Sequence, residues 1–320
     1  MSARTARTSA APDVVAGTPP RLDALLGETS RTFALTIPLL PEPTRFEVTV
    51  AYLLFRVADT LEDATLWPAR HKRAELARLG GVLRAVRHDE AERLAAGWTE
   101  RPPCDHAGYR ALLLAFPEVL DSLERLSPAA REAIREHLGR TIERMAGFVG
   151  QDADRGPTLR DLADLRSYCY AVAGIVGEML TELFLLGRPQ LDRVATDLRS
   201  GAAAFGEALQ LVNILKDAVS DRREGRSFLP PGVERDRVLA LARANLAAAG
   251  RYCRVLASAG APVGLLEFTA LPVLLARATL DRVERDGPGA KLSRPEVGAI
   301  VARMHDALER NQYDGLWTES

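Results

Sequence analysis

The sequence predicts a helical protein, built either as one large helical domain or as two small ones. Its 320 residues are enough to bury a substantial core, and 47% hydrophobic with 27% charged residues is the composition of an ordinary soluble globular protein. In the run 205–230, Leu209, Val212 and Leu215 recur at helical spacing, which predicts a helix with one buried face. Gly225 is placed to end that helix.

The amino-terminal part predicts a tail followed by two helices. Residues 1–20 are rich in Ala, Ser, Thr and Pro and lack the apolar run of a signal peptide, so we predict a disordered tail. Helical spacing begins at residue 21, and prolines 41 and 43 interrupt it. The next helix is predicted to start at Pro43 or Thr44 and to continue to an acidic cluster at 59–63.

Further helices are predicted along the rest of the chain. Residues 68–95 are highly charged and indicate surface helices with a bend at Gly80–Gly81. Ser127 and Pro128 have the residue types of an N-cap and a first helical position. We expect a folded domain over 21–312 and a polar tail over 313–320. The remaining predicted helices cover 108–125, 128–149, 165–186, 234–258 and 262–285.

Charge and cysteine usage exclude several classes of protein. The formal net charge is −1, which gives nucleic-acid binding no electrostatic support. The three cysteines are widely spaced and odd in number, which argues against a disulfide framework and for a reducing cytosol. The most apolar stretch, 264–280, is interrupted by charged residues and proline, so we predict a buried core helix there. We expect a cytoplasmic protein, with at most peripheral contact at the inner face of a membrane.

Two predicted helices carry paired carboxylates. Asp217 and Asp221 are four residues apart, and Gln210 and Asn213 continue the same stripe of the helix. Asp59 and Asp63 repeat the spacing on the earlier helix, with Glu62 beside them and Arg56 one turn before.

Carboxylates at this spacing repel each other, so the helix itself gains nothing from them. A divalent cation removes the repulsion, and Mg²⁺ is typically held by one or two carboxylates together with substrate phosphates. The alternative is that each pair lies on a solvent-exposed acidic face of its helix, which is the usual explanation for a single pair at this spacing. Two apolar helices that each carry the pair beside a basic residue favour a site for Mg²⁺ and diphosphate.

These residues resemble a known family. The run from Gln210 to Pro230 is similar to the second aspartate-rich motif of the squalene and phytoene synthase family, Q-x-x-N-x-x-[RK]-D-x-x-x-D followed by G-R-x-[FY]-x-P. The matching residues are Gln210, Asn213, Lys216, Asp217, Asp221, Gly225, Arg226, Phe228 and Pro230. The first cluster, D-T-L-E-D at 59–63, resembles the squalene synthases of the family more than the phytoene synthases. Ala64 stands where a further acid is usual.

Three further blocks extend the resemblance from Ser30 to Lys291. Glu28–Pro38 resembles the S-R-[ST]-F opening of the family. The second block, Y-C-x-x-V-A-G-x-V-G, starts at Tyr168, and the third, over Phe268–Leu280, is similar to a squalene synthase segment, with Thr269 in place of a cysteine. By this likeness Ser30, Arg31, Phe33, Tyr168 and Phe268 line the substrate cavity, and Lys291 lies where the phosphates of the reductant are contacted.

The resemblance implies an all-α isoprenoid synthase fold, a single helical domain around a central cavity with two facing aspartate-rich helices. It implies that Mg²⁺ neutralises the diphosphates of two farnesyl diphosphate molecules, which condense head to head through presqualene diphosphate to squalene, with hydride from NADPH. The implied Mg²⁺ ligands are Asp59, Glu62, Asp63, Asn213, Asp217 and Asp221. The implied substrate-binding and catalytic residues are Ser30, Arg31, Phe33, Tyr52, Arg56, Tyr168, Gln210, Lys216, Arg226 and Phe268.

The residues leave several alternatives open. A dehydrosqualene- or phytoene-type synthase, or one that releases presqualene diphosphate, would share both aspartate helices without the reduction. A catalytically inactive relative that serves as an assembly factor is a third possibility, although such relatives usually lose the aspartates. A glycine-rich dinucleotide turn is absent, so NADPH would bind in an extension of the cavity. Prenyl chain length and oligomeric state are not determined by these patterns.

Overall fold

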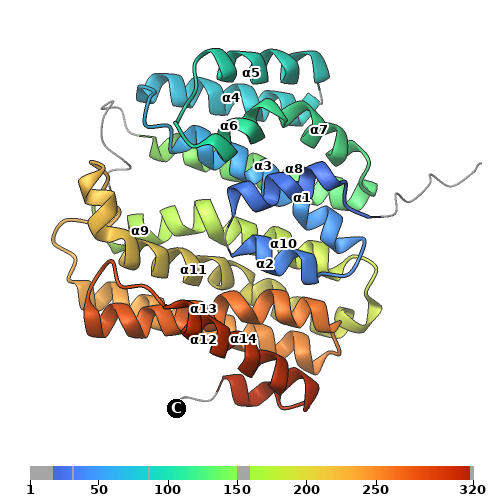
Figure 1. Ribbon diagram of the computed structural model, residues 1–320, viewed down its shortest axis with the longest axis vertical. Coiled ribbons are helices and arrows are strands. Elements are labelled where there is room, and N and C mark those ends of the chain that lie inside the picture. Colours follow the sequence, from blue (N-terminus) through green and yellow to red (C-terminus); the bar gives the residue numbers. More distant parts are fainter. Residues whose placement is uncertain (1–16, 31, 86, 150–158, 318–320) are drawn as a thin grey trace, which may run out of the picture.

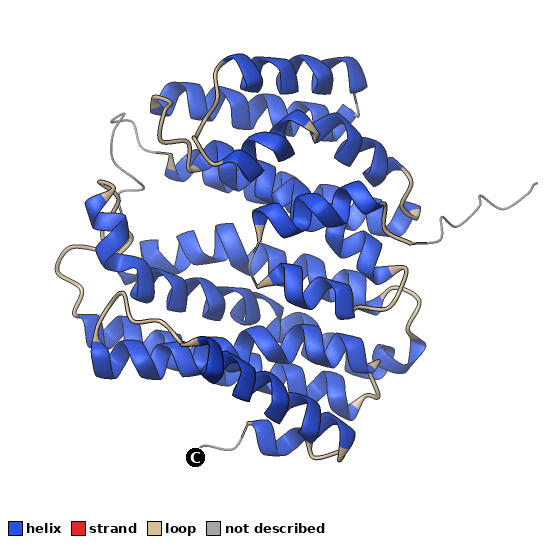
Figure 2. Ribbon diagram, in the orientation of Figure 1, coloured by secondary structure: helices blue, strands red, loops and turns tan. Residues whose placement is uncertain are grey.

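The computed structural model describes residues 17–30, 32–85, 87–149 and 159–317 (Figure 1). Over these residues the regular elements are helices and no strand occurs, as Figure 2 shows. The predicted all-α fold is thereby confirmed. The α-helices are α1 (Pro20–Thr29), α2 (Phe33–Thr36), α3 (Thr44–Glu62), α4 (Ala69–Ala85), α5 (His88–Glu100), α6 (Ala107–Leu114), α7 (Phe116–Glu124), α8 (Pro128–Phe148), α9 (Leu162–Cys169), α10 (Ile175–Leu185), α11 (Ala195–Arg223), α12 (Arg235–Ser258), α13 (Val263–Asp286) and α14 (Arg294–Glu309). Short 3₁₀ and π segments are η1 (Ile37–Leu39), η2 (Tyr170–Gly174), η3 (Pro189–Val194) and η4 (Tyr313–Leu316).

Two long helices organise the structure. Helix α3 is buried along most of its length and packs against α1, α4, α7 and α8, while α11 packs against α10, α12 and α13 (Figure 1). Val212 and Leu215 of α11 are buried as their spacing predicts, whereas Leu209 is only partly buried. Each aspartate pair therefore lies on a helix that is held in place by a large apolar interface.

The predicted helix 165–186 is divided into three parts in the structure. A π-helical turn, Tyr170–Gly174, separates α9 from α10. Helix α11 comes very close to this turn: a Cβ added to Gly206 would overlap the carbonyl oxygen of Ala173, and one added to Gly177 would overlap that of Ala202. Gly177 and Gly206 are thus required by the close backbone packing of α11 against this block.

Two local predictions are wrong. Helix α4 runs straight through Gly80–Gly81, because Leu79, Val82 and Leu83 on either side are buried in the core. The single helix predicted over 108–125 breaks at Ala115 into α6 and α7, where Pro117 lacks the N–H that would continue the ladder.

The predicted polar tail from residue 313 is also wrong. The short helix η4 packs onto the core, and Tyr313, Leu316 and Trp317 are buried. Gly250 of α12 makes room for the indole, since a Cβ there would lie 3.0 Å from Cε3 of Trp317. Three apolar residues within a polar stretch are therefore enough to anchor this segment.

Two helical stretches, Leu162–Leu185 and Val263–Asp286, are long and apolar enough to cross a membrane by length and composition alone. In both, 61% of the most apolar window is buried inside the protein. The burial of Phe268, Leu271 and Leu274 agrees with the core helix predicted for this part of the chain.

Glu47 is a buried carboxyl of α3 whose titration is expected to affect stability. Burial raises its pKa from 4.5 to about 7, an effect that Arg188 partly opposes and Glu42 reinforces. The folded protein then holds this proton more tightly than the unfolded chain, so stability falls as the pH rises from 4.5 through 7. At pH 8 we expect Glu47→Gln to raise the free energy of unfolding by about 2 kcal/mol relative to the wild type, with almost no gain at pH 4. Urea unfolding at both pH values measures this, and equal gains at the two pH values would contradict it.

Candidate functional site

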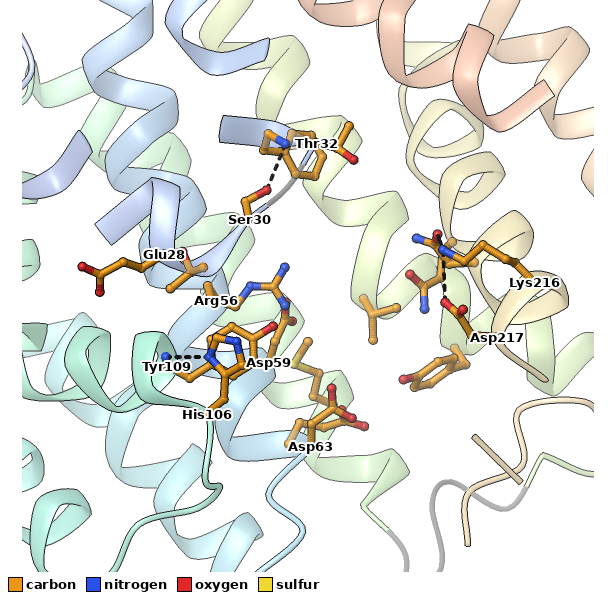
Figure 3. A pocket seen from close by; sticks show the side chains of 18 of the residues that line it. Glu28, Ser30, Thr32, Arg56, Asp59, Asp63, His106, Tyr109, Lys216 and Asp217 are labelled. Atoms are coloured by element: carbon orange, nitrogen blue, oxygen red, sulfur yellow. Dashed lines mark hydrogen bonds and ion pairs between the residues drawn. The ribbon is translucent and has the colours of Figure 1, made fainter. Parts of the chain in front are cut away.

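A polar cavity of about 790 Å³ lies between α3 and α11. Figure 3 shows Arg56, Asp59 and Asp63 on one side of it and Lys216 and Asp217 on the other. The aspartate-bearing helices thus face each other across one space. The lining also includes Glu28, Ser30, Thr32, Phe33, Glu62, His106, Tyr109, Met145, Tyr168, Val172, Gln210 and Asn213.

The α3 wall is a cluster of carboxyls in which Glu62 is buried, Asp59 is partly buried and Asp63 is exposed. Burial raises the pKa of Asp59 to about 6, with Arg56 opposing the shift and Asp63 adding to it. The Arg56 guanidinium lies 3.4 Å from the Asp59 carboxylate. Burial together with Asp63 and Asp59 raises the pKa of Glu62 well above its usual range. Burial disfavours the charged forms of Asp59 and Glu62, and a bound cation would relieve this.

Lys72 of α4 contacts this acidic cluster without lining the cavity. Its Nζ donates a hydrogen bond to the backbone oxygen of Glu62 at 3.0 Å. Burial lowers the pKa of Lys72, an effect that Glu62 and Asp63 counter. Ala64, the departure from the family pattern, is 1% exposed and part of the hydrophobic core, so its side chain contributes nothing to the cavity wall.

The α11 wall is formed by the polar stripe of that helix, which includes Gln210, Asn213 and Asp217. Lys216 Nζ donates to Asn213 Oδ1 at 3.2 Å and lies 3.2 Å from the Asp217 carboxylate. Gln210 lies toward the amino end of the stripe and lines the same cavity. One turn beyond Asp217, burial raises the pKa of Asp221 to about 6, with Arg226 opposing and Asp217 reinforcing the shift.

Arg226 connects the two acidic helices directly. Its guanidinium lies 2.8 Å from the carboxylate of Asp63 and 3.7 Å from that of Asp221, and it also pairs with Glu224 at 2.6 Å. Gly225 has a φ of 77°, which turns the chain back so that the Arg226 N–H donates to the Asp221 carbonyl at 2.8 Å. The G-R dipeptide therefore brings a positive charge between carboxylates that are far apart in sequence.

The donors present fit Mg²⁺ that is bound together with a phosphate ligand. Carboxylate oxygens line both walls and amide oxygens line the α11 wall, and the raised pKa values of Asp59 and Asp221 show that burial disfavours their ionised forms. Over the described ranges no group of three or more Asp, Glu, His or Cys side chains is arranged to hold a metal ion. Mg²⁺ commonly keeps several waters and uses one or two carboxylates plus phosphate oxygens, so an open donor set suits it.

An apolar cavity of about 200 Å³ opens from the polar one. Arg56, Asp59 and Asn213 line both, and its remaining wall is mostly hydrophobic. Ring centroids lie 5.6 Å apart for Phe33 and Tyr52, and 6.3 Å apart for Phe33 and Phe268. The aromatic residues predicted for the substrate site are therefore together. The wall also includes Ile37, Val48, Phe55, Val172, Ala173, Val176, Gly177, Met179, Leu180, Phe205, Gly206, Leu209 and Gln210.

Tyr52 and Arg56 lie at the junction of these two cavities. The Tyr52 hydroxyl donates to the Thr29 carbonyl at 2.9 Å and accepts from Arg56 Nε at 3.3 Å. The Arg56 guanidinium is 5.5 Å from the Tyr52 ring centroid and 5.7 Å from that of Tyr109. The aromatic rings and the tyrosine hydroxyl fix the position of this cation at the mouth of the apolar cavity.

A third cavity, of about 300 Å³, leads from the same junction toward Lys291. Phe33, Asn213 and Lys216 line it together with the polar cavity, and Pro272 and Leu275 of α13 form its apolar side. The backbone N–H of Gly289 donates to the Lys216 carbonyl at 2.7 Å, which attaches the Lys291 loop to α11. Lys291 thus lies in an extension of the central cavity.

Tyr168 projects into the polar cavity from α9. Its ring stacks on Phe228 at 5.3 Å and meets Phe148 edge-on at 5.3 Å. Burial and the carboxylates of Glu62, Asp63 and Asp59 raise its pKa well above the usual range. The phenol is therefore a permanently protonated hydrogen-bond donor near neutral pH.

Some predicted site residues occupy other positions. Ser30 lines the cavity, but its Oγ accepts a hydrogen bond from the Phe33 N–H at 2.9 Å and so supports the start of α2. Arg31 lies outside the described residues. Asp221 and Arg226 stand at the edge of the polar cavity without lining it, in contact with Asp63 through the Arg226 side chain.

Sequence reasoning missed a group of cavity residues on other elements. Tyr109 contacts Arg56, and His106 caps α6 by accepting from the Tyr109 N–H at 3.3 Å. Glu28 and Met145 complete the lining from α1 and α8. These residues belong to no spaced motif, so only tertiary packing brings them to the site.

Comparison with known proteins gives consistent results. The family model for squalene/phytoene synthase matches residues 26–233. The chain is 29% identical to Botryococcus squalene synthase from Botryococcus braunii over 200 residues, which is 62% of this chain and 39% of that protein. It is 30% identical to the squalene synthase of Schizosaccharomyces pombe over 207 residues, 64% of this chain and 43% of that one. The chain therefore spans about two fifths of the length of these curated relatives.

Solved structures are similar over most of the chain. The complex of TcSQS with the ligand E5700 superposes with a TM-score of 0.73 at 25% identity, covering 88% of this chain and 84% of that one. A dehydrosqualene synthase in complex with a ligand superposes with a TM-score of 0.55 at 21% identity, covering 91% and 96%. The second likeness bears on the fold alone. Since the matched region 26–233 holds both aspartate pairs and nearly two thirds of the residues, the chain belongs to the squalene/phytoene synthase family.

Proposed function

We propose that the protein is a Mg²⁺-dependent transferase that condenses two farnesyl diphosphate molecules head to head and reduces the product to squalene. The observation that carries this proposal is the junction of three cavities at Phe33 and Asn213: a polar one with acidic walls, an apolar one and one that leads to Lys291. A diphosphate, a prenyl chain and a reductant each have a compartment of suitable chemistry. The relatives named squalene synthase support the same activity.

The polar cavity is suited to the diphosphate groups. Asp59 and Asp63 on α3 and Asp217 and Asp221 on α11 would hold Mg²⁺, which when bound neutralises phosphate charge and stabilises the leaving diphosphate. Arg56 and Lys216 line the same space and would bind phosphate oxygens. Arg226, which now pairs with Asp63 and Asp221, would accept negative charge when a cation takes over those carboxylates.

The condensation requires a carbocation to be shielded from water more than it requires acid–base catalysis. The C1–O bond of one farnesyl diphosphate breaks, C1 bonds to the double bond of the second molecule, and loss of a proton closes the cyclopropane of presqualene diphosphate. Phe33, Tyr52 and Phe268 would exclude water and stabilise the cation by their ring faces. Tyr168 keeps its phenolic proton and would donate a hydrogen bond to the leaving diphosphate.

The second half of the reaction breaks the remaining C1–O bond, rearranges the carbon skeleton and adds a hydride, which NADPH supplies when bound. The cavity toward Lys291 would accept it, since this cavity opens at Phe33 and Asn213 beside the acidic walls. The exposed Lys291 ammonium would bind a phosphate of the reductant.

Lys291→Ala is expected to raise the KM for NADPH about 10-fold, because one charge-assisted contact to phosphate is lost. Consumption of farnesyl diphosphate without NADPH should stay unchanged. Lys291→Arg should restore most of the affinity. Steady-state kinetics with varied NADPH measures this, and an unchanged KM in Lys291→Ala would remove Lys291 from the reductant site.

Product analysis tests the proposed function as a whole. Purified protein is incubated with farnesyl diphosphate and Mg²⁺, once with and once without NADPH. The proposal predicts squalene only in the presence of NADPH. Dehydrosqualene or presqualene diphosphate in both incubations would support the condensation step and contradict the reduction step. The absence of any product would contradict the whole proposal.

A further inference from the structure

A separate basic pocket lies between α12, α13 and the carboxyl-terminal segment. It has a volume of about 180 Å³, and none of its lining residues lines the polar cavity or its two extensions. Four of its eight lining residues are arginines and none is acidic. The lining consists of Arg243, Leu246, Ala247, Gly250, Arg251, Arg254, Arg277 and Trp317.

Three of the four guanidinium groups carry uncompensated charge. Arg243 forms ion pairs with Asp281, at 2.5 Å, and with Glu284. No ion pair or hydrogen bond involves the side chains of Arg251, Arg254 or Arg277 within the part of the chain that the structure describes. Like charges that share one pocket repel, which is unfavourable for the fold unless an anion enters. In a chain whose formal net charge is −1, this concentration of unpaired positive charge is a local feature of this surface.

Trp317 is the one aromatic residue among those that line this pocket. Its side chain is 7% exposed, and its indole Nε1 is buried without a hydrogen-bond partner among the described residues. The other two tryptophans are satisfied: Trp67 donates to the Arg101 carbonyl at 3.1 Å and Trp98 to Glu75 at 2.8 Å. A buried N–H without an acceptor is costly.

The position of Trp317 depends on Gly250 of α12. A Cβ at residue 250 would lie 3.0 Å from Cε3 and 3.6 Å from Cδ2 of the indole. The glycine therefore lets the ring lie flat against the helix, between Arg243 and Arg254 along the same face. Three arginines of α12, one arginine of α13 and the side chain of Trp317 thus surround one small space.

We propose that this pocket binds a phosphate-type anion through Arg251, Arg254 and Arg277. Phosphate and diphosphate oxygens match the forked donors of arginine. A volume of about 180 Å³ far exceeds the space of a single water molecule and accommodates one or two phosphate groups. The anion is either free inorganic diphosphate or the headgroup of an anionic phospholipid, and both offer the same chemistry.

The indole signal of Trp317 provides a reporter for the test, because the side chain of Trp317 lines the pocket. The chain has three tryptophans, so a ¹H–¹⁵N spectrum contains three indole signals, and Trp317→Phe identifies the one from Trp317. The full chain is titrated with inorganic diphosphate in the presence of EDTA, which keeps Mg²⁺ out of the acidic cavity. In parallel it is mixed with vesicles of phosphatidylglycerol or of phosphatidylcholine, and binding is followed by co-flotation and by the same signal.

The proposal predicts that the Trp317 signal moves on addition of diphosphate or phosphatidylglycerol, while the Trp67 and Trp98 signals stay in place. Arg254→Ala and Arg277→Ala should each weaken binding about 10-fold or more. Arg93→Ala is the matched control, because it removes one positive charge from α5 at the other end of the molecule (Figure 1). Movement with diphosphate alone assigns the site to the free anion, and movement with phosphatidylglycerol alone assigns it to a lipid headgroup.

Two results would overturn the proposal. One is a Trp317 signal that neither diphosphate nor phosphatidylglycerol moves. The other is a response that is equal in the wild type, in Arg254→Ala and in Arg277→Ala. Arg254 is exposed, so the fold should tolerate Arg254→Ala even if the half-buried Arg277 does not. Squalene formation is not needed for any of these readouts, so the failure of the proposed function would leave this test unaffected.

Discussion

Asp217→Asn is expected to lower kcat/KM for farnesyl diphosphate by about 10³-fold or more, because it removes one of the few anionic donors available to Mg²⁺ and diphosphate. The substitution keeps the shape and the Lys216 neighbour but takes away the charge. Asp217 lines the polar cavity opposite Asp59 and Asp63, and its carboxylate is 3.2 Å from Lys216 Nζ. Steady-state kinetics with saturating Mg²⁺ measures the loss.

Asp197→Asn is the matched control for this variant. Asp197 lies exposed in the first turn of the same helix, α11, so the variant removes the same charge from a position outside the three cavities. We expect unfolding free energies within about 1 kcal/mol of the wild type for both variants, since surface substitutions rarely cost more. Turnover by Asp217→Asn close to that of Asp197→Asn would refute a role for Asp217 in catalysis.

Gly206→Ala is expected to lower the free energy of unfolding by about 3 kcal/mol or more, although it adds only one methyl group. The new Cβ would overlap the carbonyl oxygen of Ala173 in the π-helical turn, and backbone atoms cannot move aside as a flexible side chain can. Gly206 and Ala173 also line the apolar cavity, so the shift that accommodates the methyl group should reduce turnover as well. Urea unfolding and steady-state kinetics measure the two effects.

Gly139→Ala provides the control for the glycine variant. Gly139 is in the interior of α8, and a Cβ there would meet nothing within 4 Å. Alanine favours the helix over glycine by roughly 0.5–1 kcal/mol, so this variant should gain stability. If Gly206→Ala were as stable as Gly139→Ala, the close approach of α11 to the π-helical turn would be contradicted.

Much of the site could be predicted because its aspartate pairs lie at short spacings within single helices. Asp59 with Asp63 and Asp217 with Asp221 are four residues apart, and helical geometry alone places each pair on one face. Spacing alone does not predict that the two aspartate pairs face each other across one cavity. The family resemblance implies that arrangement.

The rest depends on tertiary packing that no local pattern encodes. The π-helical turn at Tyr170–Gly174 and the straight path of α4 through Gly80–Gly81 are set by neighbouring helices. Trp317 is buried because Gly250, distant in sequence, leaves space for its ring. Arg226 was predicted to contact phosphate, but its ion pairs with Asp63 and Asp221 are visible only once the two helices are placed together.

The central claim is that α3 and α11 form one site in which diphosphate is bound through Mg²⁺. The most direct test is calorimetric binding of a non-ionisable thio analogue of farnesyl diphosphate, with and without Mg²⁺. It is applied to the wild type, to Asp59→Asn with Asp63→Asn, and to Asp217→Asn with Asp221→Asn. We predict tight binding only in the wild type with Mg²⁺, and a loss of about 100-fold or more when either pair is replaced. Equal affinity without Mg²⁺, or Mg²⁺-dependent binding that survives the loss of one pair, would contradict a single site shared by the two helices.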